Sequence, residues 1–211
     1  MSQATLDRSE RKRGTVIEAA TSLFLSKGYD GTTMDEVAAL AGVSKPTLYR
    51  YFADKERLYA EIVAATTDDI DGLLKLVADE LAASDDPREG LGRLASKFLI
   101  ALMQPDLLRL RRLVIANAER FPEVGQGWFT SGFGRVLQTL SGAFQRYAAN
   151  GRLRVDDPLL AADHFAGLLL WIPLNRAMFS GNCDCDPAEL ARYAEAAVDA
   201  FLRGYGTEAV K

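Results

Sequence analysis

One short stretch of the sequence carries the groups that most often contact nucleic acid. Between residues 45 and 51 it offers two cations, a hydroxyl and two phenol rings, at Lys45, Thr47, Tyr49, Arg50 and Tyr51. Cations and hydroxyls bind phosphate oxygens, and donors and flat rings contact base edges in a major groove. If the stretch is helical, it presents these groups on one face. The predicted chemistry is recognition of double-stranded DNA.

Two short helices must position these groups. Thr33 followed by Glu36 predicts a capping box at the start of the first helix, which ends at Gly42. Ser44 is an N-cap for the second, and Pro46 sits in its first turn, where proline loses no helical hydrogen bond. Two short helices joined by a glycine-containing turn are typical of a helix-turn-helix.

An apolar pattern predicts how this motif is sealed. Residues 9–27 form an amphipathic helix that Gly28 ends in a left-handed cap. The apolar positions that face it from the two short helices are Val37, Ala38, Ala41, Val43, Leu48 and Phe52. The small alanines allow a close helix crossing, so the polar and aromatic face of the second helix is left outward.

The rest of the chain also has helical periodicity, and no stretch alternates as a strand. The expected fold is all-α with about nine helices: an N-terminal three-helix bundle with the helix-turn-helix in residues 1–54, and a C-terminal helical domain for ligand binding and dimerisation in residues 55–211. The further helices are expected over 55–83, 88–103, 105–118, 122–150 with glycine interruptions, 158–179 with a bend near Pro173, and 187–203.

Charge is spread unevenly along the chain. Residues 1–60 hold nine Lys or Arg against eight Asp or Glu, and the remainder holds 16 against 21, which gives the net charge of −4. The pI of 5.2 alone argues against nucleic-acid binding. However, Arg8, Arg11, Lys12 and Arg13 form a basic arm at the start that could meet phosphate.

The helix-turn-helix region resembles the TetR/AcrR family of transcriptional regulators. The matching residues are Gly28-Tyr29, Thr32-Thr33, Val37-Ala38, Ala41 to Ser44, Leu48 to Phe52 and Lys55-Glu56. The resemblance implies that Thr33 and Ser44 contact phosphate from helix N-termini, that Lys45, Thr47 and Tyr49 face bases, and that Tyr51 and Lys55 hold the DNA backbone. The alternative is that Thr33 and Ser44 are only caps and the tyrosines only packing.

The C-terminal region resembles the AefR-like group more loosely, through Arg111 to Leu113, Ala118 to Pro122 and Gly151 to Leu153. The resemblance implies a small, partly apolar ligand bound within residues 85–180, which carry many large aromatic residues. The expected pocket residues are Phe98, Leu102, Leu113, Trp128, Phe133 and Trp171. With no cluster of like charge among them, we expect a planar or aliphatic ligand with few charges. The alternative is an ordinary hydrophobic core.

The last helix carries a broad apolar stripe that predicts a homodimer. Its members include Leu190, Tyr193, Ala197 and Phe201. The family resemblance and the small alanines favour a four-helix seam with a second copy. Packing within one subunit is the alternative.

Other chemistries find little support. The single histidine, His164, excludes most histidine-dependent catalysis and most metal sites, and there is no P-loop motif. We expect Cys183 and Cys185 to be two free thiols in a reducing compartment; the alternatives are a redox pair or half of a metal site. We expect no cofactor, no metal, no enzyme activity and no membrane span, and a cytoplasmic location.

The sequence therefore predicts a homodimeric DNA-binding regulator, a repressor that a small apolar molecule releases from a palindromic operator. One alternative is an all-helical ligand-binding or enzymatic domain whose helix-turn-helix only packs, which a sequence-specific gel shift would distinguish. A second is a regulator that responds to a partner protein or to cysteine oxidation and not to a ligand.

Overall fold

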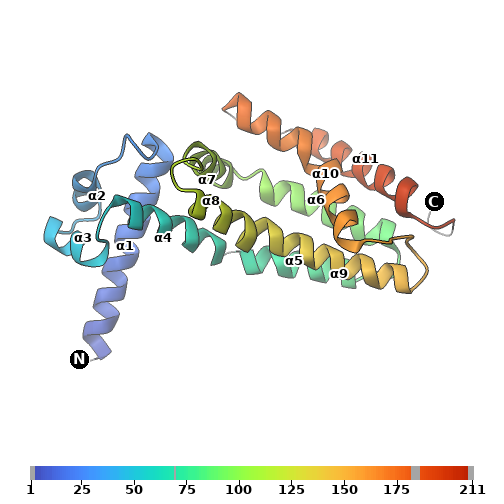
Figure 1. The fold of residues 1–211 in the computed structure, drawn as a ribbon, viewed down its shortest axis with the longest axis horizontal. Helices are drawn as coiled ribbons and strands as arrows, with labels where there is room; N and C mark the ends of the chain where they lie inside the picture. The colour runs from blue at the N-terminus through green and yellow to red at the C-terminus, as the bar shows by residue number, and fades with distance from the viewer. Residues whose placement is uncertain (1–2, 69, 182–185, 209–211) are drawn as a thin grey trace. The chain divides into compact units, whose positions relative to one another are not determined.

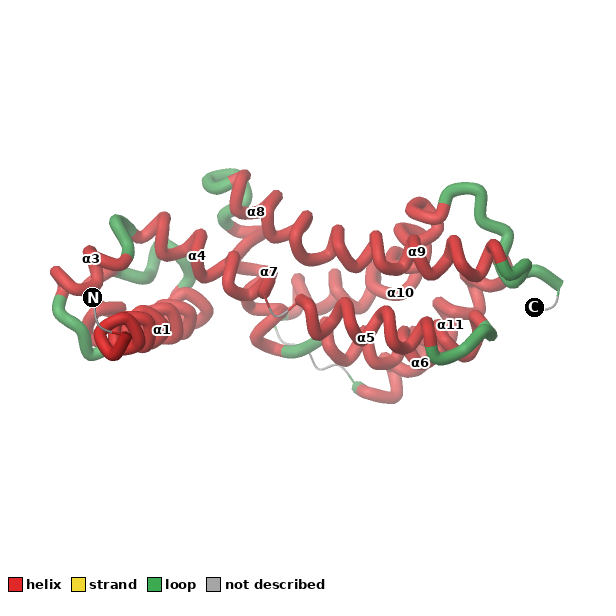
Figure 2. Tube along the Cα trace, turned by 90° about the horizontal axis from the view of Figure 1, so that it is seen from below, coloured by secondary structure: helices red, strands yellow, loops and turns green. Residues whose placement is uncertain are grey.

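The computed structural model describes residues 3–68, 70–181 and 186–208 (Figure 1). These residues form eleven α-helices and one π-helical segment. No strand forms among them, and an isolated β-bridge pairs Leu153 with Gly206. The prediction of an all-α fold is confirmed, as the helices and connecting loops of Figure 2 show.

Backbone contacts divide the chain into two compact units. The first unit consists of residues 1–68 and 109–128. It contains α1 (Gln3–Lys27), α2 (Met34–Leu40), α3 (Lys45–Tyr51), α4 (Lys55–Asp68), most of α7 (Pro105–Ala116) and nearly all of α8 (Pro122–Phe129). The second unit consists of residues 69–108 and 129–211. Its further helices are α5 (Ile70–Ala82), α6 (Pro87–Leu102), α9 (Arg135–Ala149), α10 (Pro158–Ser180) and α11 (Pro187–Tyr205).

The first unit is built around α1. Val16, Ala20 and Phe24 of this helix are buried against the helix-turn-helix and against α4. The domain boundary expected between residues 54 and 55 falls inside this unit, because Leu58 and Ile62 of α4 are buried in the same core. The division into domains 1–54 and 55–211 stays a prediction.

The second unit is a helical bundle with a larger core. Helix α9 packs against α5 and α10, and α6 packs against α11. Phe144, Phe165 and Phe201 come from three of these helices, and the centroid of the Phe201 ring lies 5.0 Å from that of Phe144 and 5.3 Å from that of Phe165. Aromatic pairs at this spacing stabilise a fold beyond the contribution of the apolar area that they bury, so these three rings stabilise the centre of the bundle.

Two of the expected helices correspond to more than one element in the structure. The expected helix 55–83 corresponds to α4 and α5, which the structure describes on either side of residue 69; that residue lies outside the described ranges. The expected helix 122–150 is interrupted by a π-helical segment at Thr130–Gly134, where glycines weaken the α-helix. Pro173 lies inside the continuous helix α10.

Candidate nucleic-acid interface and ligand sites

The start of α2 is fixed by the predicted capping box. The Thr33 hydroxyl accepts a hydrogen bond from the Glu36 backbone N–H at 3.3 Å, and the Thr33 N–H donates to Glu36 Oε2 at 3.0 Å. Lys27 Nζ also donates to Glu36 Oε1, at 2.7 Å. These bonds, first from Lys27 and then from Thr33, lower the pKa of Glu36 from 4.5 to about 2. Glu36 is therefore a charged clamp that ties α1 to the helix-turn-helix.

The start of α3 is capped in the same way. Gly42 takes a φ of +63°, a left-handed conformation that glycine adopts without strain, and turns the chain between the two helices. Ser44 then accepts a hydrogen bond from the Thr47 backbone N–H at 3.4 Å, and the two hydroxyls lie 2.8 Å apart. Pro46 occupies the first turn, as predicted. The Ser44 and Thr47 hydroxyls thus lie at the N-terminus of α3, the end at which the helix dipole favours an anion.

The inner and outer faces of α3 differ sharply. Leu48 and Phe52 are fully buried, and Val37 of α2 is buried with them. On the outer side, Lys45 and Arg50 are exposed, and Tyr49 keeps 49% of its surface accessible. The predicted seal is confirmed, and it leaves a face of cations and phenol rings on a rigid helix.

The outer face is held by weak contacts that DNA could replace. Lys45 Nζ pairs with Asp35 Oδ2 at 2.6 Å, and both side chains are 61% exposed. An exposed pair of this kind contributes at most about 1 kcal/mol. The half-buried Tyr51 hydroxyl lies 3.2 Å from Ser9 Oγ, and its pKa is lowered by that hydrogen bond and by Arg50. Lys45 and Tyr51 can therefore turn to phosphate at little cost.

Lys55 has a structural task that the sequence did not indicate. Its Nζ donates to the backbone oxygens of Tyr29 at 2.9 Å and Thr32 at 3.0 Å, and lies 4.2 Å from the centroid of the Tyr29 ring. The ammonium group thus fixes the turn between α1 and α2. An ammonium has three donors, so one remains for the predicted DNA backbone contact.

The expected effector-pocket residues lie in both units. Leu113 and Trp128 belong to the first unit, where Leu113 is buried and Trp128 half-buried. In the second unit, Phe98 and Leu102 are buried in the core and Phe133 packs against it. Trp171 is 67% exposed on α10. Their common pocket stays a prediction.

The expected dimer residues on α11 largely face their own unit. Leu190, Ala197 and Phe201 are buried in the core of the second unit, so they have little surface to offer a second copy. Tyr193 is half-buried, and its hydroxyl accepts a hydrogen bond from Arg176 at 3.4 Å. In the single chain the apolar stripe packs inside its own unit, and the seam with a second copy stays a prediction.

Helix α10 shows an exposed apolar surface that the sequence analysis did not find. Helix α10 is apolar on nearly all sides, so the periodicity of its sequence could not distinguish an inner face from an outer one. We call it the α10 face; its exposed members are Leu159, Leu160, Leu168, Trp171, Ile172 and Phe179.

Arg111, which entered the sequence analysis only through the AefR-like resemblance, is also a candidate for ligand binding. The centre of its guanidinium lies 5.3 Å from the centroid of the Trp128 ring, and burial lowers its pKa below the usual range for arginine. No carboxylate partner is recorded for it among the described residues. A buried cation without an acidic partner is costly. The sequence alone could not distinguish Arg111 from the neighbouring arginines 109 and 112.

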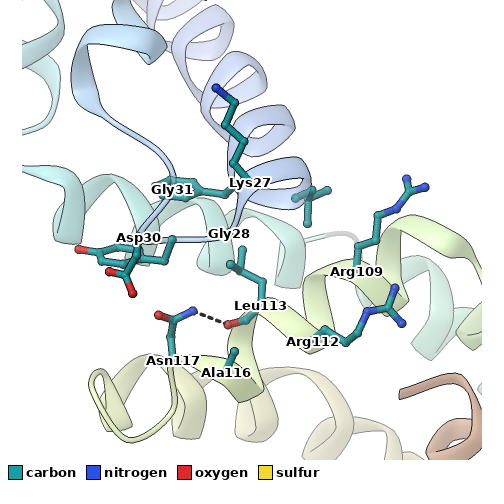
Figure 3. A pocket seen from close by; sticks show the side chains of 12 residues that line it. Lys27, Gly28, Asp30, Gly31, Arg109, Arg112, Leu113, Ala116 and Asn117 are labelled. Atoms are coloured by element: carbon teal, nitrogen blue, oxygen red, sulfur yellow. Dashed lines mark hydrogen bonds between the residues drawn. The ribbon is translucent and has the colours of Figure 1, made fainter. Parts of the chain in front are cut away.

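A cavity of about 570 Å³ lies within the first unit, between the end of α1, the turn that follows it and α7 (Figure 3). Its volume is in the range of small-molecule sites. Leu113 is the one expected effector-pocket residue on its wall. The complete lining is Phe24, Leu25, Lys27, Gly28, Tyr29, Asp30, Gly31, Arg109, Arg112, Leu113, Ala116 and Asn117.

The remaining candidates from the sequence are one histidine and two cysteines. His164 Nδ1 lies 2.6 Å from the Tyr205 hydroxyl, a contact between α10 and α11. Cys183 and Cys185 lie outside the described residues. Among residues the structure does describe, no cluster of three or more metal-ligating side chains occurs, and no helix is long and apolar enough to cross a bilayer.

Two family models match the chain. Residues 16–62 match bacterial regulatory proteins of the tetR family, and residues 89–207, more than half of the chain, match the C-terminal domain of AefR-like transcriptional repressors. The chain therefore belongs to the TetR family, whose members are DNA-binding transcriptional regulators and not enzymes. Both resemblances seen in the sequence are confirmed.

Similar proteins support the assignment. A TetR-family regulator from Mesorhizobium loti MAFF303099 is 46% identical, with a TM-score of 0.87, over 95% of this chain and 99% of that one. The flavonoid-responsive regulator FrrA is 30% identical, with a TM-score of 0.75, over 94% and 99%. The transcriptional activator FasR of Mycolicibacterium smegmatis is 41% identical over 86 residues, which are 41% of this chain and only 37% of FasR.

Proposed function

We propose that this chain is a homodimeric repressor that binds a palindromic operator and leaves it when a small molecule binds. The observation that carries the proposal is α3, a helix capped by Ser44, sealed by Leu48 and exposing Lys45 and Tyr49. Such a helix places donors and a ring in a major groove while its inner face stays in the core. Repression, and not activation, is supported by the match to AefR-like repressors. The regulator would work in the cytoplasm.

The α10 face supports the homodimer. Leu168, Trp171, Ile172 and Phe179 recur at helical spacing, and Phe179 is 88% exposed in the single chain. Exposed apolar surfaces of this kind mark interaction sites, and a second copy presents the same surface. Two copies related by a two-fold axis would carry two reading helices, and for that reason the operator is expected to be palindromic.

The ligand is expected to be small and largely apolar. The relative FrrA is flavonoid-responsive, and flavonoids are planar molecules with few charges. The half-buried Arg111 lies against the expected pocket residue Trp128, so the effector would gain from a single acidic or strongly accepting group. An effector that binds the DNA-free form about 100-fold more tightly shifts operator affinity by about 2.7 kcal/mol.

Selected operator DNA tests the proposal. Fragments retained by the protein are labelled, and apolar compounds with and without an acidic group are titrated into the complex. Trp128 and Trp171 are the two tryptophans of the chain, so their fluorescence reports binding. The expected result is quenching together with release of DNA, with Trp128→Phe removing most of the signal. Quenching at saturation while DNA stays bound would contradict the coupling.

A further inference from the structure

The cavity of the first unit has two chemically different sides. Leu113 projects from α7 toward its middle, with Arg109 and Arg112 together on one side of it and Asp30 and Asn117 on the other (Figure 3). Phe24, Leu25 and Ala116 supply further apolar wall. The cavity therefore offers an apolar centre between a basic end and an end with acceptor oxygens.

The cavity is basic although the chain is acidic. Three cations line it, at Lys27, Arg109 and Arg112, against the single carboxylate of Asp30. Lys27 is paired with Glu36, and Asp30 with Arg120 at 3.0 Å. The two arginines also have neighbours in the structure. Because a guanidinium has five N–H donors in a planar fork, it can hold a protein neighbour and an anion together.

The wall formed by the turn is fixed before any ligand arrives. Gly28 takes a φ of +75°, and a Cβ on Gly31 would collide with the Lys27 carbonyl oxygen, so both positions require glycine. Lys55, which is not part of the lining, donates hydrogen bonds to the Tyr29 and Thr32 carbonyls and so fixes the turn. On the opposite wall, the Asn117 amide donates to the Leu113 carbonyl at 2.8 Å. A pre-formed site avoids part of the entropic cost of binding.

We propose that this cavity is a second small-molecule site, inside the DNA-reading unit, for a small amphipathic carboxylic acid. The carboxylate binds Arg109 and Arg112, an aromatic or aliphatic body lies on Leu113, and a hydroxyl at the far end donates to Asp30 or Asn117. The site is distinct from the expected effector pocket, with which it shares Leu113. Its turn wall leads into Thr33, the first residue of the helix-turn-helix cap.

Calorimetric titration of the full-length protein without DNA tests the site. The probes are 3-(4-hydroxyphenyl)propionate, its methyl ester, and 3-phenylpropionate, which lacks the hydroxyl. Hydrogen bonds to a charged group are worth more than neutral ones, so the methyl ester is expected to bind at least about tenfold more weakly than the acid. Loss of the hydroxyl is expected to weaken binding by a smaller factor.

Matched variants locate the site. Arg112→Gln removes one of the two cations that bind the carboxylate, and Ala116→Phe fills the cavity; each is expected to weaken binding of the acid at least about tenfold. Ile115→Phe, one residue away at an exposed position outside the lining, and Arg192→Gln, exposed on α11, are expected to leave the affinity unchanged. Circular dichroism confirms that each variant is folded.

Three results would overturn the inference. They are no binding of the acid at millimolar concentration, equal binding of acid and ester, and unchanged binding to both the Arg112→Gln and the Ala116→Phe proteins. Because no operator and no effector enter the titration, these results are independent of the proposed repressor function. A failure of DNA release by apolar compounds would in turn leave the acid site standing.

Discussion

The two units have similar interiors and different surfaces. In the first unit, the centroid of the Tyr29 ring lies 5.3 Å from that of Tyr59 and 5.0 Å from that of Phe121. In the second, Phe201 takes the corresponding place among aromatic rings. Outside, α3 exposes cations and a phenol, whereas α10 exposes large apolar side chains such as Phe179.

This difference indicates what each unit binds. An exposed cation such as Lys45 stays hydrated until a phosphate or a base binds it. The helix that carries it is therefore stable in solution without DNA. Burial of an exposed Trp171 or Phe179 in an interface would remove apolar surface from water, so a protein partner is expected there. The cores explain why the units fold, and the exposed faces indicate their partners.

The largest expected effect is the loss of the dimer. Phe179→Glu and Trp171→Glu each place a charge on the α10 face and are expected to give monomers by analytical ultracentrifugation. Operator affinity should fall by about 10²–10⁴-fold, because a single reading head loses the benefit of two linked contacts. Ile115→Glu changes an exposed apolar residue of the first unit and should leave the dimer intact. Wild-type protein that sediments near 23.1 kDa at micromolar concentration would refute the assignment.

The next effect concerns base recognition. Tyr49→Ala is expected to weaken operator binding by about 1–3 kcal/mol and to leave binding to random DNA unchanged, because a base contact and not a phosphate contact is lost. Fluorescence anisotropy with both DNAs measures the two affinities. The oligomeric state and the melting temperature serve as controls, and both should be unchanged because Tyr49 is exposed. If the variant bound both DNAs equally more weakly, Tyr49 would contact the DNA backbone and not a base.

Two matched helix caps give a smaller effect. Ser44 caps α3 in the first unit, and Asp157 caps α10 in the second, accepting from Leu159 N–H at 3.0 Å. Ser44→Ala and Asp157→Ala should each lower the free energy of unfolding by about 0.5–2 kcal/mol. Only Ser44→Ala should also weaken operator binding. If both variants bound DNA like the wild type, Ser44 would be a cap alone.

The smallest effect is a pH dependence in the first unit. The pKa of Glu36 is lowered to about 2 in the folded chain, so its charge stabilises the fold above its ordinary pKa of 4.5, and this contribution is lost as the pH falls toward 2. Glu36→Gln keeps an acceptor for Thr33 but removes the charge. Urea unfolding should show a difference between wild type and variant at pH 7 that shrinks below pH 4.5. A difference that is constant with pH would exclude the charge as its cause.

Local patterns predicted the DNA-reading unit well. The capping box of Thr33 and Glu36 and the cap at Ser44 depend on residues three apart, so the sequence alone contained them. The burial of Leu48 followed from helical periodicity in the same way. These features need no knowledge of distant residues.

Long-range features could not be predicted in this way. Lys55 contacts carbonyls more than 20 residues away, and a cation after a helix-turn-helix gives no sign of that task. The stripe on α11 predicted a seam, but periodicity does not say whether its partner is the same chain or a second one. The cavity beside Arg109 and Arg112 depends on how α7 meets the end of α1, which no local pattern records.

The most direct test of the central claim is selection of bound fragments from the organism's own genomic DNA, with wild-type protein and a Thr47→Ala, Tyr49→Ala double variant in parallel. We expect the wild type to enrich a few fragments that share an inverted repeat, and the double variant, although folded and dimeric, not to enrich them. No enrichment by the wild type, or the same fragments retained by the variant, would contradict the claim that α3 reads an operator.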